Sequence, residues 1–248
     1  MQFLPIKTRP LLPPQDDIYP VLDEFVSTLH ERDVLVITSK VLGIHQGRCV
    51  KIETETKEEK DALIMAEADA YIPRDQVPNE YALLTVKDNT LVSSAGIDKS
   101  NTNGYYVMWP ENNQQLLQEI WEYLRRRDGL KDLGIISVDS HSLPLRYGTL
   151  GISTGFYGIK PVRDCRGAKD IFGRPLQVTR MNIVDSLAGM SVTLMGEGAE
   201  CTPLLIIRDS DIIEFTDNDC YDELMIPVED DMFYPLLRVF HDRKKSKQ

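Results

Sequence analysis

Three short segments combine carboxylates, hydroxyls and glycines in a way that could bind a metal ion and a phosphate group. The first, residues 94–101, reads Ser-Ala-Gly-Ile-Asp-Lys-Ser-Asn and follows a predicted strand. It places the Asp98 carboxylate, the Ser100 hydroxyl and the Asn101 amide within four residues. A hard cation such as Mg²⁺ prefers carboxylate and neutral oxygen ligands. The same residue types also build capped turns, so a purely structural turn is the alternative interpretation.

The second segment, residues 137–148, contains Asp139 and Arg146. Asp139 follows a short apolar run that predicts a buried strand ending there, which would set a carboxylate at the edge of a sheet. Arg146 can make a forked contact with a phosphate or a carboxylate. A helix cap or a simple turn is the alternative.

The third segment, residues 195–202, contains Gly196, Glu197 and Gly198. Glycines let backbone amides approach a phosphate closely, and Glu197 could supply another oxygen ligand. The alternative is an exposed turn between a helix and a strand. Residues 161–179 lie between the second and third segments and concentrate positive charge; they fit either anion recognition or a loop whose charges are paired internally. Their basic residues are Arg163, Arg166, Lys169 and Arg174, and their acidic ones are Asp164 and Asp170.

The common nucleotide and hydrolase signatures are absent from the sequence. It has no G-x-x-x-x-G-K-[ST] phosphate loop, no G-x-G-x-x-G after a strand, no H-E-x-x-H and no G-x-S-x-G. The four histidines do not have metal-binding spacing. These absences exclude the usual ATPase, dehydrogenase, zinc hydrolase and serine hydrolase interpretations.

Composition and charge indicate an ordinary globular protein. The 248 residues carry 28 basic and 39 acidic side chains, a net charge of −11, and ten of the acidic residues lie in residues 209–231. An acidic chain is not expected to bind nucleic acid non-specifically. No apolar run is long enough for a membrane helix, and we see no signal peptide. The four cysteines have no C-x-x-C spacing, so we expect reduced thiols and a cytoplasmic protein.

The pattern of apolar residues predicts an α+β fold. Helices are expected at residues 16–29, 57–70, 112–127 and 182–195, and strands at 34–38, 133–138 and 204–207. Residues 82–86 and 90–93 should form a hairpin. Because strands and helices mix without a regular alternation, a doubly wound parallel sheet is less favoured.

Taken in order, these segments make the chain similar to the coenzyme F420:L-glutamate (γ-glutamyl) ligase family, which includes folate γ-glutamyl ligase-like bacterial relatives. The resemblance covers about residues 1–208. It rests on Leu4-Pro5, Ser39-Lys40, Ala95-Gly96-Ile97-Asp98, Ser100-Asn101, Asp139-Ser140, Arg163-Asp164, Lys169-Asp170, Gly173-Arg174, Gln177-Val178-Thr179 and Met195-Gly196-Glu197-Gly198.

The resemblance implies a cytoplasmic, GTP-dependent ligase that forms an amide bond between L-glutamate and a carboxylate of a deazaflavin coenzyme precursor through an acyl phosphate. It implies mixed sheets with helices in an intertwined homodimer. It also implies two divalent ions, Mg²⁺ or Mn²⁺, with K⁺ as a further candidate.

The resemblance assigns roles to particular positions. The implied metal ligands are Asp98, Asp139, Ser140 and Glu197. We predict Arg146 and Arg163 as the catalytic cations. The implied nucleotide-binding residues are Leu4, Pro5, Ile6, Lys7, Ser39, Lys40, Asn101, Met195, Gly196, Gly198, Ala199, Glu200, Cys201 and Thr202.

Two departures from the family pattern keep other functions open. Ser142-Leu143 replace a Gly-Arg pair, and Ile44 replaces a second lysine. A folate γ-glutamyl ligase, a related phosphate-using enzyme with another acceptor and a non-catalytic nucleotide-binding relative are therefore alternatives. We predict that residues 1–208 form the catalytic unit, followed by an acidic segment and a basic tail at residues 209–248.

Overall fold

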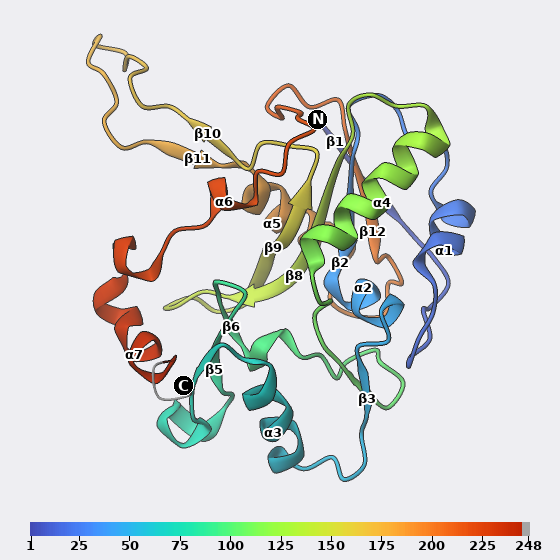
Figure 1. The fold of residues 1–248 in the computed structure, drawn as a ribbon, viewed down its shortest axis with the longest axis vertical. Coiled ribbons are helices and arrows are strands. Elements are labelled where there is room, and N and C mark those ends of the chain that lie inside the picture. The colour runs from blue at the N-terminus through green and yellow to red at the C-terminus, as the bar shows by residue number, and fades with distance from the viewer. Residues whose placement is uncertain (245–248) are drawn as a thin grey trace.

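The computed structural model describes residues 1–244, and the last four residues of the predicted basic tail lie outside the described part (Figure 1). Its centre is a five-stranded mixed sheet in the order β1-β12-β2-β8-β9. The strands are β1 (Gln2–Ile6), β2 (Val34–Thr38), β8 (Gly134–Ser142), β9 (Thr149–Tyr157) and β12 (Leu204–Arg208). Only β2 and β8 pair in parallel within this sheet. The predicted α+β class is confirmed.

Helices cover both faces of this sheet because its central strands are apolar on both sides. Leu35, Ile37 and Ile135 face the core shared with α1 (Ile18–Phe25), α2 (Ser39–His45) and α4 (Asn113–Asp128). Val36 and Ile136 face the opposite core, which contains α5 (Ile183–Met195). The alternation along a strand therefore sends Ser137 and Asp139 towards α4, and Ser140 towards α5.

A smaller layer lies beside the main sheet and carries the first candidate loop. It contains β3 (Cys49–Lys51) paired with β7 (Tyr105–Val107), α3 (Lys57–Glu67), and the three-stranded sheet β4 (Ala70–Ile72), β5 (Leu84–Lys87) and β6 (Thr90–Ser93). Single 3₁₀ turns occupy Arg74–Gln76, Pro78–Glu80 and Ser94–Gly96. Ile64 of α3 packs with Ala95 and Ile97, which fixes the start of the 94–101 loop.

Several element boundaries differ from those predicted. The strand expected to end at Asp139 continues to Ser142, because residues 139–142 pair with residues 149–152 of β9. The helix expected at 57–70 ends at Glu67, and Ala70 already belongs to β4. The helix expected at 16–29 spans only Ile18–Phe25; Leu29 is buried beyond its end.

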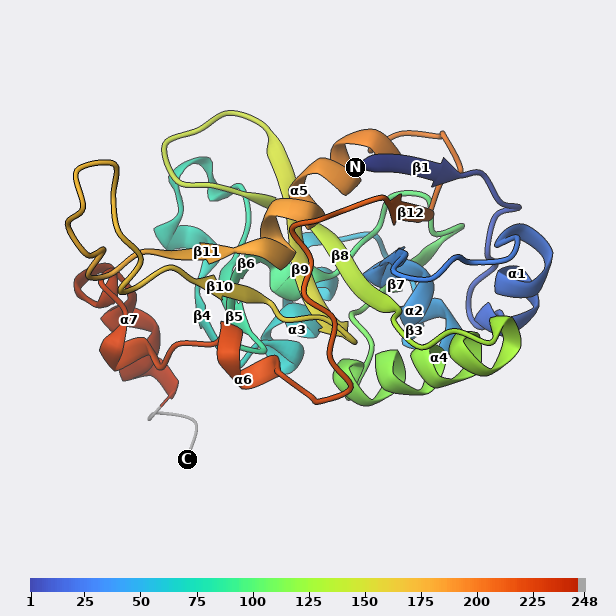
Figure 2. The same cartoon turned by 90° about the horizontal axis from the view of Figure 1, so that it is seen from above.

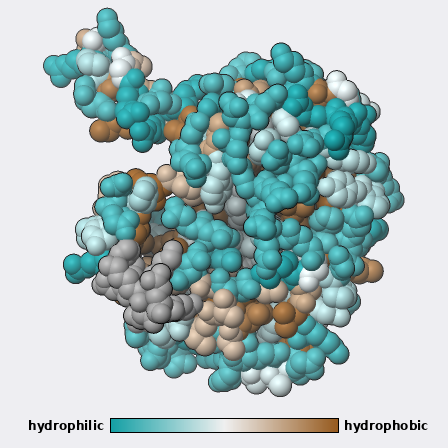
Figure 3. Space-filling model, viewed as in Figure 1, coloured by the Kyte–Doolittle hydropathy of each residue, from teal (hydrophilic) through white to brown (hydrophobic). Residues whose placement is uncertain are grey.

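Residues after β9 leave the body of the molecule and return. The two-stranded ribbon of β10 (Val162–Asp164) and β11 (Arg180–Asn182) projects outward, with the long loop 165–179 at its tip (Figures 1 and 2). Ile171, Phe172 and Val178 expose apolar side chains on that tip, which stands apart in the space-filling view (Figure 3). No helix within residues 1–244 combines the length and apolar composition needed to cross a bilayer.

The acidic segment packs on the body. Ile213 and Cys220 are buried in the core that contains α5, and Phe215 packs against it. α6 (Tyr221–Leu224), a 3₁₀ turn at Val228–Asp230 and α7 (Tyr234–Lys244) complete the chain. The division at residue 208 stays a prediction. All four cysteines are free thiols.

Candidate active site

Backbone contacts bring the candidate nucleotide-binding segments together at one end of the main sheet. The Thr8 N–H donates to the Cys201 carbonyl at 2.9 Å, which joins residues 4–7 to the 195–202 loop. The Thr38 N–H donates to the Pro203 carbonyl at 3.0 Å, which holds Ser39 and Lys40 beside that loop. The Asn101 amide donates to the Gly198 carbonyl at 2.7 Å, so the first and third candidate loops also meet.

The 195–202 loop has a defined conformation. Gly196 follows α5 with a φ of +84°, and a Cβ added there would lie 2.6 Å from the Glu200 carboxyl carbon. Glu200 accepts a hydrogen bond from the Gly198 N–H at 2.8 Å. The loop is an exposed turn between a helix and a strand, and glycine is needed at its first position.

Lys40 and Asp98 form the charged centre of the site. The Lys40 Nζ atom lies 3.2 Å from the Asp98 Oδ2 atom, and both side chains are partly exposed. Lys40 lies in the first turn of α2, directly after β2. Asp98 is held by two backbone hydrogen bonds of 2.9 Å to Val107. The end of β2 therefore positions Lys40, and pairing with Val107 of β7 positions Asp98.

Asp139 is a partly buried carboxylate beside this pair. The Trp109 indole N–H and the Ser140 N–H both donate to it. Burial, followed by the nearby Asp98 carboxylate, raises the pKa of Asp139 to about 7, although the two hydrogen bonds and the Lys40 charge act in the opposite direction. A carboxyl group whose pKa is raised in this way would be stabilised in its charged form by an added cation.

Glu197 approaches the same centre from the other side of β8. Burial first, and Asp98 second, raise the pKa of Glu197, while Lys40 and hydrogen bonds from Thr149 and Ser140 oppose that rise. Asp139 and Glu197 therefore both lie close enough to Asp98 and Lys40 to interact with them electrostatically. Among the described residues, no three histidine, cysteine or acidic side chains are already close enough to form a complete metal-binding cluster.

The donor set fits a divalent ion in kind. Three carboxylates and the Ser140 hydroxyl are the hard oxygen donors that Mg²⁺ and Mn²⁺ prefer. In the structure the Lys40 ammonium balances the negative charge of Asp98, which is the role that a bound metal ion would also have. These residues could hold such an ion.

The two predicted catalytic arginines lie apart from this centre. Arg146 is on the exposed 143–148 loop, which arches away from the sheet (Figure 2), and its side chain donates to the neighbouring Leu145 carbonyl. Arg163 lies on β10 and donates to the Ile212 carbonyl at 2.9 Å. Within the part of the chain that the structure describes, neither guanidinium contacts Asp98, Asp139 or Glu197. Arg166 pairs with Asp164, which favours internal pairing for that part of the cationic stretch.

Sequence reasoning missed two residues of the site, Trp109 and Lys60. A tryptophan in a sequence is typical of a core residue, and Trp109 is indeed buried. Its indole N–H nevertheless donates to Asp139. Lys60 lies one helical turn before the buried Ile64 on α3, and burial lowers the pKa of its ammonium while Asp98 opposes that effect. The sequence does offer a sign of this role, because Lys60 lies four residues before an apolar residue, Ile64, and therefore on the inward face of the predicted helix.

Gly96 makes the contact between Trp109 and the 94–101 loop possible, which yields a prediction. Gly96 has a φ of +69°, and an added Cβ would lie 2.2 Å from the indole ring. We expect Gly96→Ala to move Trp109 off Asp139 and to lower turnover at least about tenfold, which corresponds to ~1.4 kcal/mol of barrier. Steady-state kinetics would measure the change. Gly104→Ala is the control, because Gly104 also has a positive φ but nothing lies within 4 Å of its added Cβ.

Comparisons with known proteins identify relatives of this chain. Residues 6–209 match the family model described as F420-0:Gamma-glutamyl ligase. The chain is 32% identical over 217 residues to the coenzyme F420:L-glutamate ligase of Methanosarcina mazei, covering 83% of this chain and 85% of that protein. It is 31% identical to the Methanococcus maripaludis protein of the same name over 90% of this chain and 94% of that one. The Halorubrum lacusprofundi protein of that name is 28% identical over 96% of this chain and 98% of its own length. The chain therefore belongs to the F420-0:gamma-glutamyl ligase family.

Proposed function

We propose that this protein is a GTP- and divalent-metal-dependent ligase that joins L-glutamate to a carboxylate of a coenzyme F420 precursor. The observation that carries the proposal is the convergence of Lys40, Asp98 and the partly buried Asp139 beside the joined 4–8 and 195–202 segments. Family membership and the names of the relatives support glutamate ligation.

A carboxylate is a poor electrophile, so the acceptor must be activated first. Its carboxylate oxygen attacks the γ-phosphorus of GTP, the bond to the β–γ bridging oxygen breaks, and GDP leaves. The glutamate amine then attacks the acyl carbon and loses a proton, the carbon–oxygen bond to the phosphoryl group breaks, and inorganic phosphate departs with the oxygen that came from the acceptor carboxylate. A metal ion, when bound, neutralises charge on the transferred phosphoryl group.

We assign each of the following side chains a role in that reaction. Lys40 can contact the phosphate, because its ammonium already faces an anionic group at the start of α2. Asp98, Asp139, Ser140 and Glu197 would hold the metal ion. Trp109 fixes Asp139, and Lys60 adds a second positive charge near Asp98. Positioning and electrostatics supply the rate enhancement, so no serine or cysteine nucleophile is needed.

We also propose that a second copy of the chain covers the exposed tip of the β10–β11 ribbon. Ile171, Phe172 and Val178 are 92%, 83% and 85% exposed there. Exposed apolar clusters of this kind are typical of interaction sites. In a homodimer, this ribbon would also carry Arg163 towards the partner.

Thermal unfolding with GTP, in the presence and absence of Mn²⁺, tests the nucleotide and metal site. At ~100 times its Kd, a ligand adds about 2.7 kcal/mol of stability. For a chain of this size we therefore expect a rise in Tm of about 5–11 °C. The rise should require Mn²⁺ and disappear in Asp98→Ala, while Asp217→Ala, at an exposed aspartate paired with Arg125, should retain it. No shift with GTP would contradict the proposal.

A further inference from the structure

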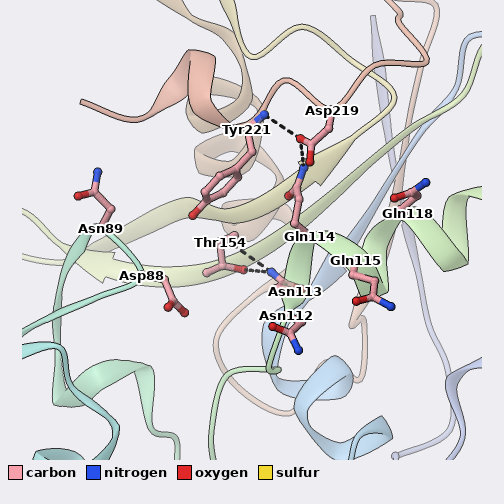
Figure 4. A pocket seen from close by; sticks show the side chains of 10 residues that line it. All are labelled: Asp88, Asn89, Asn112, Asn113, Gln114, Gln115, Gln118, Thr154, Asp219 and Tyr221. Atoms are coloured by element: carbon pink, nitrogen blue, oxygen red, sulfur yellow. Dashed lines mark hydrogen bonds between the residues drawn. The ribbon is translucent and has the colours of Figure 1, made fainter. Parts of the chain in front are cut away.

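A polar cavity of about 590 Å³ lies on the α4 side of the main sheet (Figure 4). Four segments far apart in the sequence form its walls: the β5–β6 turn, the start of α4, the edge strand β9, and residues 219–221. Its volume is in the usual range for pockets that bind small molecules.

The walls of this cavity carry amides and carboxylates but no positive charge. Asp88 and Asp219 line it together with asparagine and glutamine side chains, Thr154 and Tyr221, and none of its lining residues is Lys, Arg or His. Such walls repel phosphates and carboxylates. They favour an uncharged group whose N–H donors face the two aspartates and whose carbonyls face the amide N–H groups.

The polar groups are held in place before any ligand binds. Asp219 accepts hydrogen bonds from the Gln114 amide at 3.0 Å and from the Tyr221 N–H at 2.9 Å. The Asn113 amide donates to the Thr154 carbonyl at 3.0 Å, which fixes its orientation. The Asn113 Oδ1 atom is buried and, among the described residues, has no hydrogen-bond partner.

A bulge in β9 places the wall of this cavity near the candidate active site. Ser137 pairs with Gly155 and Val138 with Ser153, so Thr154 is the extra residue, and its hydroxyl lies 2.7 Å from the Ser137 hydroxyl. Ser137 and Asp139 are two residues apart on the same face of β8, which corresponds to about 7 Å. The cavity wall at Thr154 therefore lies only a few residues along the sheet from the reaction centre.

We infer that this cavity binds the planar lactam ring system of the acceptor coenzyme, with its N–H edge towards Asp88 and its face against Tyr221 (Figure 4). The inference rests on the proposed function and adds the place of the acceptor. Aromatic side chains provide stacking surfaces for flat rings. The anionic part of the acceptor would extend along β8 and β9 towards Lys40. Deazaflavins and pterins share this lactam edge.

Fluorescence titration tests the inference with a deazaflavin nucleoside that lacks the phosphate-bearing tail, and in parallel with a neutral pterin. We expect one of the two to bind without GTP or metal, which also identifies the acceptor class. Asp88→Asn should weaken binding at least tenfold; Asp88 has a φ of +47°, which asparagine also tolerates, so the turn should fold. Asn113→Leu is the second variant. Gln15→Ala is the control, since Gln15 is an exposed amide whose side chain donates to the His45 carbonyl, outside this cavity.

Kinetics separate a failure of this inference from a failure of the proposed function. Asp88→Asn should raise the KM for the acceptor at least tenfold and leave the KM for GTP unchanged. If glutamate is ligated but neither variant changes ring binding or the acceptor KM, the inference is overturned and the proposed function stands. If the ring binds and both variants weaken it, but no glutamate is ligated, the cavity is supported and the proposed function fails.

Discussion

Asp139→Asn should abolish turnover while leaving the protein folded. We expect kcat/KM to fall by at least about 10³-fold, equivalent to ~4 kcal/mol of lost transition-state stabilisation. Asparagine has the same shape and can still accept the hydrogen bond from Trp109, but it brings no negative charge to the metal and phosphate site. Steady-state assays of GDP release with the F420 precursor and glutamate would measure the loss.

The stability of this variant distinguishes a catalytic role from a structural one. Because burial penalises the charged form of Asp139, removing that charge should leave the Tm unchanged or raise it. Asp217→Asn, at an exposed position, serves as the charge-matched control and should change neither activity nor Tm. Normal turnover in Asp139→Asn would remove this residue from the active site.

Lys40→Met should produce the second largest loss of activity. Lys40 is the only cation in a direct ion pair with Asp98 among the described residues, and it would contact the phosphates of GTP. Methionine keeps most of the length of the side chain without its charge. We expect kcat/KM to fall by about 10²–10³-fold, the size of effect seen when one electrostatic contact to a transition state is removed.

Lys99 offers a closely matched comparison for Lys40. It is adjacent to Asp98 in sequence, yet its exposed ammonium pairs with Glu55. Lys99→Met should therefore retain near-normal kcat/KM. Equal losses in the two variants would mean that general positive charge around the site, rather than the contact made by Lys40, determines the rate.

The sequence allowed good prediction of elements with strong apolar periodicity. The strand at residues 34–38, the hairpin around residues 88–89 and the helices starting near residues 113 and 183 are confirmed. Boundaries failed where long-range pairing decides them: β8 extends past Asp139 only because β9 is present to pair with it. Local residue patterns carry no information about that partner.

The candidate site shows the same limit. The loops that contain Asn101 and Gly198 were both identified from their residue types, but the hydrogen bond that joins them is seen only in the folded chain. Trp109 was missed because a tryptophan is explained equally well by core packing, and Lys60 because a lysine is explained equally well by the solvated face of a helix. The cavity lined by Asp88 and Tyr221 could not be predicted, because its four wall segments meet only in the folded chain.

Oxygen transfer from the acceptor to phosphate is the most direct test of the central claim. The F420 precursor would be labelled with ¹⁸O in its carboxylate and incubated with the protein, GTP, L-glutamate and Mg²⁺, and the glutamylated product and released phosphate analysed by mass spectrometry. An acyl phosphate intermediate predicts one ¹⁸O atom in each phosphate released with each amide bond formed. Glutamylated product with unlabelled phosphate would contradict the mechanism, and the absence of any glutamylated product would contradict the proposed function itself.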